Sequence, residues 1–219
     1  MHHRDAEVSD TTMHDRIDHY HSTLRNLAAA VEATDRSGDV VSVATVLGRF
    51  IASARAAHDD GAKLMFVGNG GSAGIASHMA IDYSKNGGMR SLAFNDGAAL
   101  TCLGNDLGYE NVFARQIEMH GRPGDVLIAI SSSGRSPNIL SAVEAARRIG
   151  AAFILTLSGF TPDNPLRATG DGNLYAPSDQ YGFVEILHLT LCHAALDLSM
   201  GWGVPALEAA EPAIQRTEP

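Results

Sequence analysis

The sequence predicts an α/β protein in which parallel strands alternate with helices. Two apolar runs, residues 64–67 and 126–130, are typical of strands that are buried on both faces. Each run leads into a turn rich in glycine or serine, and a segment with helical spacing follows each turn. Ligands of such sheets bind outside the carboxyl ends of the strands, so we expect both turns to face one crevice.

Two helical segments precede the first strand. Apolar residues recur at helical spacing over residues 13–34 and again over 39–59. Two helices at this position cannot cover a parallel sheet by themselves, so we expect part of their apolar surface to pack against another subunit. The alternative is that they only cap their own domain.

Five strands and the helices between them follow in order. The predicted strands are residues 64–67, 91–94, 126–130, 152–157 and 173–176. The predicted helices begin near Ala73 and span residues 98–103, 110–120, 137–148 and 182–200. Residues 158–171 are rich in Gly, Pro, Asp and Asn and predict a loop with at most one helical turn.

The whole pattern predicts a single domain over residues 13–200, with oligomerisation helices at about 13–60. Residues 1–12 are predicted to be disordered, and residues 201–219 to form a flexible tail.

Composition excludes several classes of protein. The 219 residues include 16 basic and 25 acidic ones, and a net charge of −9 argues against a nucleic-acid or membrane-surface partner. No apolar run approaches the roughly 20 residues that span a bilayer. Two cysteines are too few for a disulfide framework, and the polar N-terminus lacks a signal core. We therefore expect a cytoplasmic protein.

The first turn, residues 68–72, predicts a phosphate cradle made of backbone N–H groups and a helix N-terminus. It also matches two short patterns, the Gly-x-Gly-x-x-Ala of dinucleotide sites and the Gly-x-Ser-x-Gly of serine hydrolases. The dinucleotide interpretation lacks an acidic residue about 20 positions on. The hydrolase interpretation lacks an oxyanion loop before the turn. The absence of Gly-Lys-Ser/Thr excludes a P-loop ATPase.

The second turn, residues 131–136, predicts a second phosphate-binding segment. It holds four serines, one glycine and Arg135 between a strand and a helix whose first residue is Pro137. Ordinary helix capping explains Ser136 but not the three consecutive serines before it. Arg135 either reinforces the site or points into solvent.

Two helices carry residue types that bind metals. Glu185, His188, Cys192 and His193 share one face of the last helix, and His78 and Asp82 lie one turn apart on another helix. Two histidines and two carboxylates from two helices form a plausible four-ligand site for zinc or a similar ion. For His188 alone, we favour a buried core histidine.

Taken together, four motifs resemble the SIS (sugar isomerase) domain, and within it the sedoheptulose 7-phosphate isomerases, also called phosphoheptose isomerases. These motifs are GNGGSA after a strand, LGND near the middle, GDVLIAISSSGRSPN, and a final helix with Glu-x-x-His-x-x-x-x-His. The resemblance covers about residues 13–200 and keeps the motifs in the family's order. It implies a three-layer α/β/α sandwich with a five-stranded parallel sheet, a homotetramer with sites at subunit interfaces, and one zinc ion per subunit.

The resemblance also implies the roles of individual residues. Phosphate and substrate contacts would come from Asn69, Gly70, Gly71, Ser72, Asp106, Ser131, Ser132, Ser133, Ser136 and Glu185. The metal ligands would be His78, Asp82, Glu185 and His193, and the proton-transfer residues would be His193 and Asp82. Two positions depart from the family, because Asp82 stands where it has Glu and Glu185 where it typically has Gln.

The function expected from this resemblance is ketose–aldose isomerisation through an enediol. The substrate pair would be sedoheptulose 7-phosphate and D-glycero-D-manno-heptose 7-phosphate. One alternative is isomerisation of a different phosphosugar. Another is a non-catalytic SIS protein that senses or binds sugar phosphates, although such proteins typically lose the metal and acid–base residues.

Overall fold

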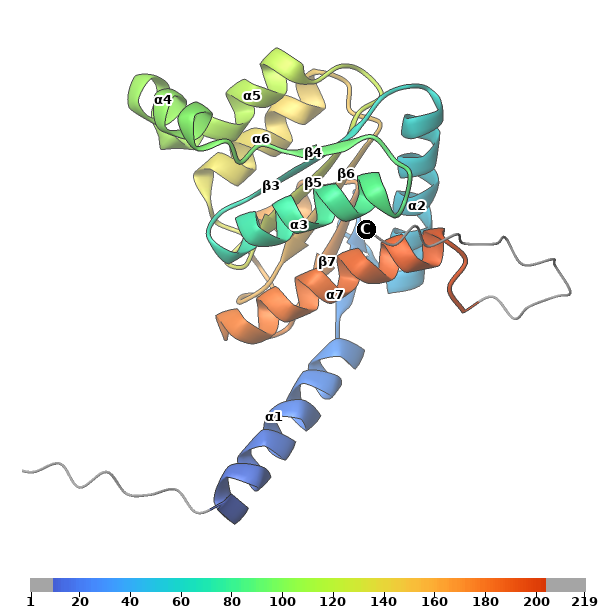
Figure 1. Ribbon diagram of the computed structural model, residues 1–219, viewed down its shortest axis with the longest axis vertical. Helices are drawn as coiled ribbons and strands as arrows, with labels where there is room; N and C mark the ends of the chain where they lie inside the picture. The colour runs from blue at the N-terminus through green and yellow to red at the C-terminus, as the bar shows by residue number, and fades with distance from the viewer. Residues whose placement is uncertain (1–9, 204–219) are drawn as a thin grey trace, which may run out of the picture.

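A central sheet with helices on both faces forms the body of the computed structural model, which describes residues 10–203 (Figure 1). The strands are β1 (Glu32–Asp35), β2 (Val40–Val41), β3 (Leu64–Gly68), β4 (Ser91–Ala93), β5 (Val126–Ser131), β6 (Phe153–Ser158) and β7 (Gly172–Tyr175). The helices are α1 (Asp10–Ala29), α2 (Val43–Asp59), α3 (Gly71–Lys85), α4 (Gly97–Leu107), α5 (Val112–His120), α6 (Pro137–Arg148) and α7 (Tyr181–Ser199). Short 3₁₀ helices span η1 (Tyr109–Asn111) and η2 (Pro165–Ala168).

The spatial order of the sheet is β2-β1-β7-β6-β5-β3-β4. The five strands from β7 to β4 are parallel, which confirms the predicted α/β/α fold class and its five parallel strands. The phosphate turns predicted after residues 67 and 130 follow β3 and β5, which are direct neighbours. This adjacency brings the two turns together.

An antiparallel hairpin, β1–β2, extends the sheet beyond β7 and corrects the sequence prediction. Helices were predicted over residues 13–34 and 39–59, but α1 ends at Ala29 and α2 begins at Val43. Pairing of β1 with β7 buries Ala33 and Thr34 and so outweighs the helical spacing. The Asp35 carboxylate accepts hydrogen bonds from two backbone N–H groups of the turn, and Ser42 caps α2.

Two apolar clusters hold the layers together. The larger packs α2, α3 and α7 on one face of the sheet, and the second packs α5 and α6 on the other. Side chains of β3 alternate between the two clusters. Leu64 and Phe66 pack in the first, whereas Met65 and Val67 pack in the second. The central strands are therefore apolar throughout, as a sheet covered on both faces requires.

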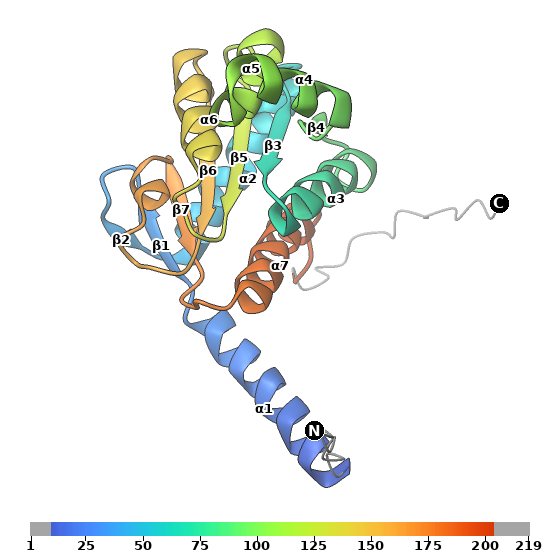
Figure 2. The ribbon, with the colours of Figure 1, turned by 90° about the vertical axis from the view of Figure 1, so that its left-hand side faces the viewer.

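The helix α1 projects away from this body (Figure 2). Met13, Ile17 and Tyr20 on α1 are 43%, 46% and 42% exposed, whereas α2 buries its apolar side chains against its own sheet. α2 therefore covers its own domain, which was the alternative to packing against another subunit. On α1, Tyr20 stacks on Phe183 of α7, with ring centroids 4.5 Å apart, whereas Met13 and Ile17 remain exposed.

The two ends of the described chain are more ordered than the sequence predicts. Residues 10–12 belong to α1, and residues 201–203 form a turn after α7. The remaining parts, residues 1–9 and 204–219, lie outside the described residues. None of the helices within residues 10–203 is long and apolar enough to cross a membrane.

Candidate functional site

A cavity of about 240 Å³ lies at the carboxyl ends of β3 and β5. Its lining residues are Asn69, Gly70, Gly71, Ser72, Ile130, Ser131, Ser132, Ser133, Ser136, Tyr181 and Glu185. The two turns singled out from the sequence thus line one cavity, as predicted. Sequence reasoning missed Ile130 and Tyr181.

Three helices begin at this cavity, and their backbone N–H groups make it a site for an anion. α3 begins beside Gly70, α6 after Ser136, and α7 at Tyr181. None of these three N-termini receives a side-chain capping bond within the described part of the chain. Uncapped N–H groups and three positive helix ends attract a phosphate, although no Lys or Arg lines the cavity.

Glycine allows the first turn to approach α3 and α7 closely. Gly70 has a φ of 54°, a left-handed conformation that side chains with a Cβ rarely adopt. A Cβ at Gly71 would collide with both carboxylate oxygens of Glu185. Glu185 therefore lies against the first residue of α3, at the edge of the phosphate cavity.

The serines of the second turn are arranged as hydrogen-bonding groups of one loop. The hydroxyls of Ser131 and Ser136 are 3.1 Å apart, and the Ser133 hydroxyl accepts the backbone N–H of Arg135. The Arg135 guanidinium instead donates to Thr161 and Asp163, 3.2 and 3.3 Å away. Of the two alternatives for Arg135, the structure favours the one in which it lies outside the phosphate cavity.

A second cluster, which we call the metal group, consists of His78, Asp82 and His193. One potential ligand atom from each residue lies within 4.8 Å of the others. The His78 and His193 rings are 5.4 Å apart, and His78 Nε2 is 3.5 Å from an Asp82 oxygen. Two imidazole nitrogens and one carboxylate oxygen make a donor set that suits zinc with a position left open.

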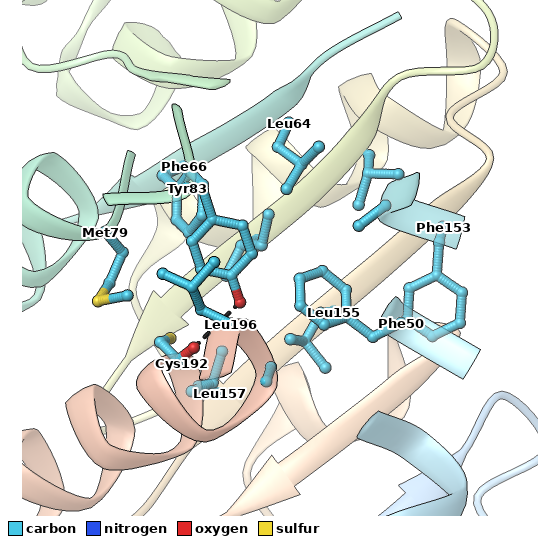
Figure 3. Close-up of a cluster of buried hydrophobic side chains, with 14 of the residues drawn as sticks. Phe50, Leu64, Phe66, Met79, Tyr83, Phe153, Leu155, Leu157, Cys192 and Leu196 are labelled. Carbon is cyan, nitrogen blue, oxygen red and sulfur yellow. Dashed lines mark hydrogen bonds between the residues drawn. The ribbon is translucent and has the colours of Figure 1, made fainter. Parts of the chain in front are cut away.

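Packing of α3 against α7 creates the metal group. The Tyr83 hydroxyl donates to the backbone carbonyl of Cys192 at 3.0 Å, inside the large apolar cluster (Figure 3). Tyr83 follows Asp82 and Cys192 precedes His193 in the chain, so this bond fixes the two helices next to the ligands. Burial raises the pKa of Tyr83, and it raises that of the Cys192 thiol to about 12. Both groups stay neutral and structural.

Glu185 and Asp106 lie apart from the metal group. Glu185 is eight residues before His193, or about 12 Å along the helix axis, and it lines the phosphate cavity instead. The resemblance implied that Asp106 contacts the substrate. Asp106 lies near the end of α4, which continues beyond the predicted helix 98–103, and it accepts a hydrogen bond from its neighbour Asn105. It does not line the cavity.

His188 is the buried core histidine that we favoured. It is fully buried, and its Nε2 lies 3.0 Å from the Ser158 carbonyl. Burial lowers the pKa of His188 to about 4, so its imidazole is neutral. It supports α7 from inside the body, between Glu185 and His193.

Asn69 takes part in a hydrogen-bond network that sequence reasoning missed. Its carboxamide exchanges two hydrogen bonds with that of Asn138, and it accepts a third from the Tyr109 hydroxyl. Asn138 follows Pro137 at the start of α6, and Tyr109 lies on η1. Tyr109 lies outside the motifs quoted above, and Asn138 ends one of them, but only their proximity to Asn69 shows what either side chain does.

Comparison with known proteins links this geometry to one family. The SIS domain family matches residues 20–158. A phosphoheptose isomerase from Bradyrhizobium sp. (strain BTAi1) is 42% identical over 177 residues, which cover 77% of this chain and 87% of that protein. A phosphoheptose isomerase from Streptomyces coelicolor is 36% identical over 191 residues, covering 83% of this chain and 76% of that protein.

Solved structures agree with this relationship. The phosphoheptose isomerase from Neisseria gonorrhoeae superposes with a TM-score of 0.73 at 26% identity, covering 86% of this chain and 99% of that one. The phosphoheptose isomerase from Francisella tularensis gives a TM-score of 0.72 at 25% identity, over 86% and 98% of the two chains.

Proposed function

The chain belongs to the SIS domain family and groups with its phosphoheptose isomerases, and we propose that it interconverts sedoheptulose 7-phosphate and D-glycero-D-manno-heptose 7-phosphate. As a member of this group it is a sugar-phosphate isomerase. The observation that carries the proposal is one phosphate cavity and one metal group placed along the same two helices.

The spacing of these two regions supports a long sugar. α3 and α7 lie side by side (Figure 1). Residues near the start of each helix line the cavity. The metal group lies about 9–12 Å along them, because His78 is six positions after Ser72 and His193 is eight positions after Glu185, at about 1.5 Å per residue. An extended seven-carbon chain with its phosphate ester also spans about 10 Å, given single bonds near 1.5 Å. A phosphate in the cavity would then leave C1 and C2 beside the metal group.

The residues of the cavity bind and orient the substrate. Ser131, Ser133 and Ser136 donate hydroxyl hydrogens to phosphate oxygens, and the N-terminal N–H groups of α3 and α6 donate beside them. This binding energy holds the far end of the sugar at the metal group, so that C1 and C2 are positioned before reaction.

The residues of the metal group carry out the chemistry at C1 and C2. A zinc ion held by His78, Asp82 and His193 would supply Lewis acidity for the carbonyl oxygen. We assign proton transfer between the two carbons to His193 and Asp82. Because a residue that ligates a metal is a poor base, these residues would share or exchange the roles of ligand and base. Removal of the proton next to the carbonyl gives the enediolate. Transfer of a proton between the two oxygens and return of the first proton to the neighbouring carbon complete the isomerisation.

We further propose a homotetramer in the cytoplasm. The exposed apolar side chains of α1 support assembly, because a surface of this kind on a projecting helix gains stability from a partner. The free thiols of Cys102 and Cys192 fit a reducing compartment.

The test combines metal analysis with NMR of turnover. Purified protein is analysed for zinc and incubated with sedoheptulose 7-phosphate, with and without a chelator. We expect about one zinc per subunit and conversion that stops when the metal is removed. Bound zinc without conversion would exclude this sugar, and the absence of both zinc and conversion would favour a non-catalytic SIS protein.

A further inference from the structure

We propose that Tyr109 is a positioning residue, which orients Asn69 so that Asn69 presents an N–H donor to the phosphosugar. The inference rests on the proposed function. It is carried by the hydrogen-bond network between Asn69, Asn138 and Tyr109, and it identifies the substrate atom at this point of the cavity as an acceptor oxygen.

Asn69 and Asn138 form a reciprocal pair of carboxamides. Asn69 Nδ2 donates to Asn138 Oδ1 at 2.9 Å, and Asn138 Nδ2 donates to Asn69 Oδ1 at 2.8 Å. Asn138 is only 2% exposed, so it holds Asn69 from inside the protein. The pair joins the turn before α3 to the first turn of α6, the two segments that line the phosphate cavity.

Tyr109 adds a third bond and saturates one side of the Asn69 carboxamide. Its hydroxyl lies 3.0 Å from Asn69 Oδ1, which then accepts from both Tyr109 and Asn138. A carbonyl oxygen has two lone pairs and an amide nitrogen has two hydrogens. The oxygen is fully used, one N–H is used by Asn138, and the second N–H remains available to the cavity that Asn69 lines.

The amide pair alone does not fix this orientation. If both carboxamides were turned over together, the pair would keep its two bonds and Asn69 would present an oxygen instead. Tyr109 favours the first arrangement, because a phenol is a good donor and a weaker acceptor than an amide carbonyl. The orientation of a cavity residue thus depends on a residue outside the cavity lining.

The backbone on both sides of Tyr109 has a defined conformation. Gly108 has a φ of 85° and ends α4, and the Asn111 side chain donates to the Leu107 carbonyl at 2.7 Å. The Tyr109 side chain is itself exposed, at 59% for the residue, so loss of its hydroxyl leaves the core untouched. Substitution of Tyr109 therefore tests orientation rather than folding.

The first experiment compares Tyr109→Phe with the wild type in turnover of sedoheptulose 7-phosphate. We expect kcat/KM to fall about 3- to 10-fold, mainly through a higher KM, as for loss of one hydrogen bond to a site residue. The matched control is Tyr175→Phe, which removes a hydroxyl that donates to the Phe160 backbone carbonyl. It should change thermal stability without changing KM, and equal KM effects in both variants would overturn the inference.

A double-mutant cycle tests whether Tyr109 acts through Asn69 or contacts the substrate itself. In an Asn69→Ala background, Tyr109→Phe should have no further effect on kcat/KM, because its target is gone. An undiminished effect in that background contradicts the proposal.

Asn69→Asp tests the orientation itself. The carboxylate still accepts from Tyr109 and Asn138, but it has no N–H to offer the sugar. We expect it to lower kcat/KM further than Asn69→Ala does, and activity near that of the wild type would show that Asn69 acts as an acceptor.

Failure of the proposed function would appear separately, as a wild type that binds but does not convert the sugar. The same variants are then compared by calorimetry through their Kd for sedoheptulose 7-phosphate and for inorganic phosphate. The order wild type, Tyr109→Phe, Asn69→Asp in increasing Kd supports the inference without turnover. A wild type that binds neither compound overturns both proposals.

Discussion

The phosphate cavity and the metal group lie along the same two helices but are built in different ways. The cavity is made by short turns directly after neighbouring strands, with backbone N–H groups and serine hydroxyls as its donors. The metal group depends on side chains more than a hundred residues apart, brought together where α3 packs on α7. The phosphate cavity is therefore formed by residues close together in the sequence, whereas the metal group forms only when the whole body is packed.

The largest expected effect separates catalysis from phosphate binding. His193→Ala removes a residue of the metal group without touching the cavity, so turnover should fall by about 10²- to 10⁴-fold and bound zinc should be lost. The Kd for inorganic phosphate should stay the same. His120→Ala, an exposed histidine of α5 on the other face of the sheet, is the control. Retained isomerase activity in His193→Ala would contradict the assignment.

The next prediction concerns the part of α7 between the two regions. Burial lowers the pKa of His188 from 6.5 to about 4, so the unfolded chain binds a proton below pH 6.5 while the folded chain does not. The neutral, buried His188 therefore stabilises the fold fully above pH 6.5, and this stabilisation is lost as the pH falls toward 4. The free energy of unfolding should be about 2 kcal/mol lower at pH 5 than at pH 7 from this group. Chemical denaturation at pH 7 and pH 5 measures it. His188→Gln should lose less stability over this range, and an identical loss in both proteins would contradict the burial argument.

A glycine substitution should damage the cavity and spare the metal group. A Cβ at Gly68 would lie 2.5 Å from the backbone oxygen of Ser72, so Gly68→Ala forces the turn to move. We expect a loss of about 1–3 kcal/mol in the free energy of unfolding and at least tenfold weaker binding of inorganic phosphate. Gly74→Ala is the matched control in α3, since a Cβ there meets nothing within 4 Å. Zinc content should be unchanged in both variants, and loss of zinc in Gly68→Ala alone would show that the two regions are not separate.

The smallest expected effect decides to which region Glu185 belongs. Glu185→Gln removes a negative charge from the edge of the phosphate cavity, so KM should fall by a few-fold while zinc content stays constant. Isothermal titration with zinc and steady-state kinetics measure the two quantities. Loss of zinc would instead make Glu185 the fourth ligand that its helix face predicted.

The same contrast explains how much the sequence predicted. The patterns of strand, turn and helix placed eight of the cavity residues, because each pattern is contained in a few neighbouring positions. Helical spacing put Glu185 and His193 on one face, but it did not show how far apart two helical turns hold them. The hairpin β1–β2 was missed since its strands are short and gain their stability from β7, far away in the sequence. Tyr109 lies outside the quoted motifs, and Asn138 ends one of them without a role assigned to it.

The hairpin also determines how the sheet meets solvent. β2 has two residues and β4 has three, so both ends of the seven-stranded sheet finish in very short strands. A long free edge offers unpaired N–H and C=O groups to any other extended chain and is a starting point for aggregation. Without β1 and β2, the buried four-residue strand β7 would form the edge of the sheet. The hairpin thus protects the protein against strand addition at the edge of the sheet opposite β4.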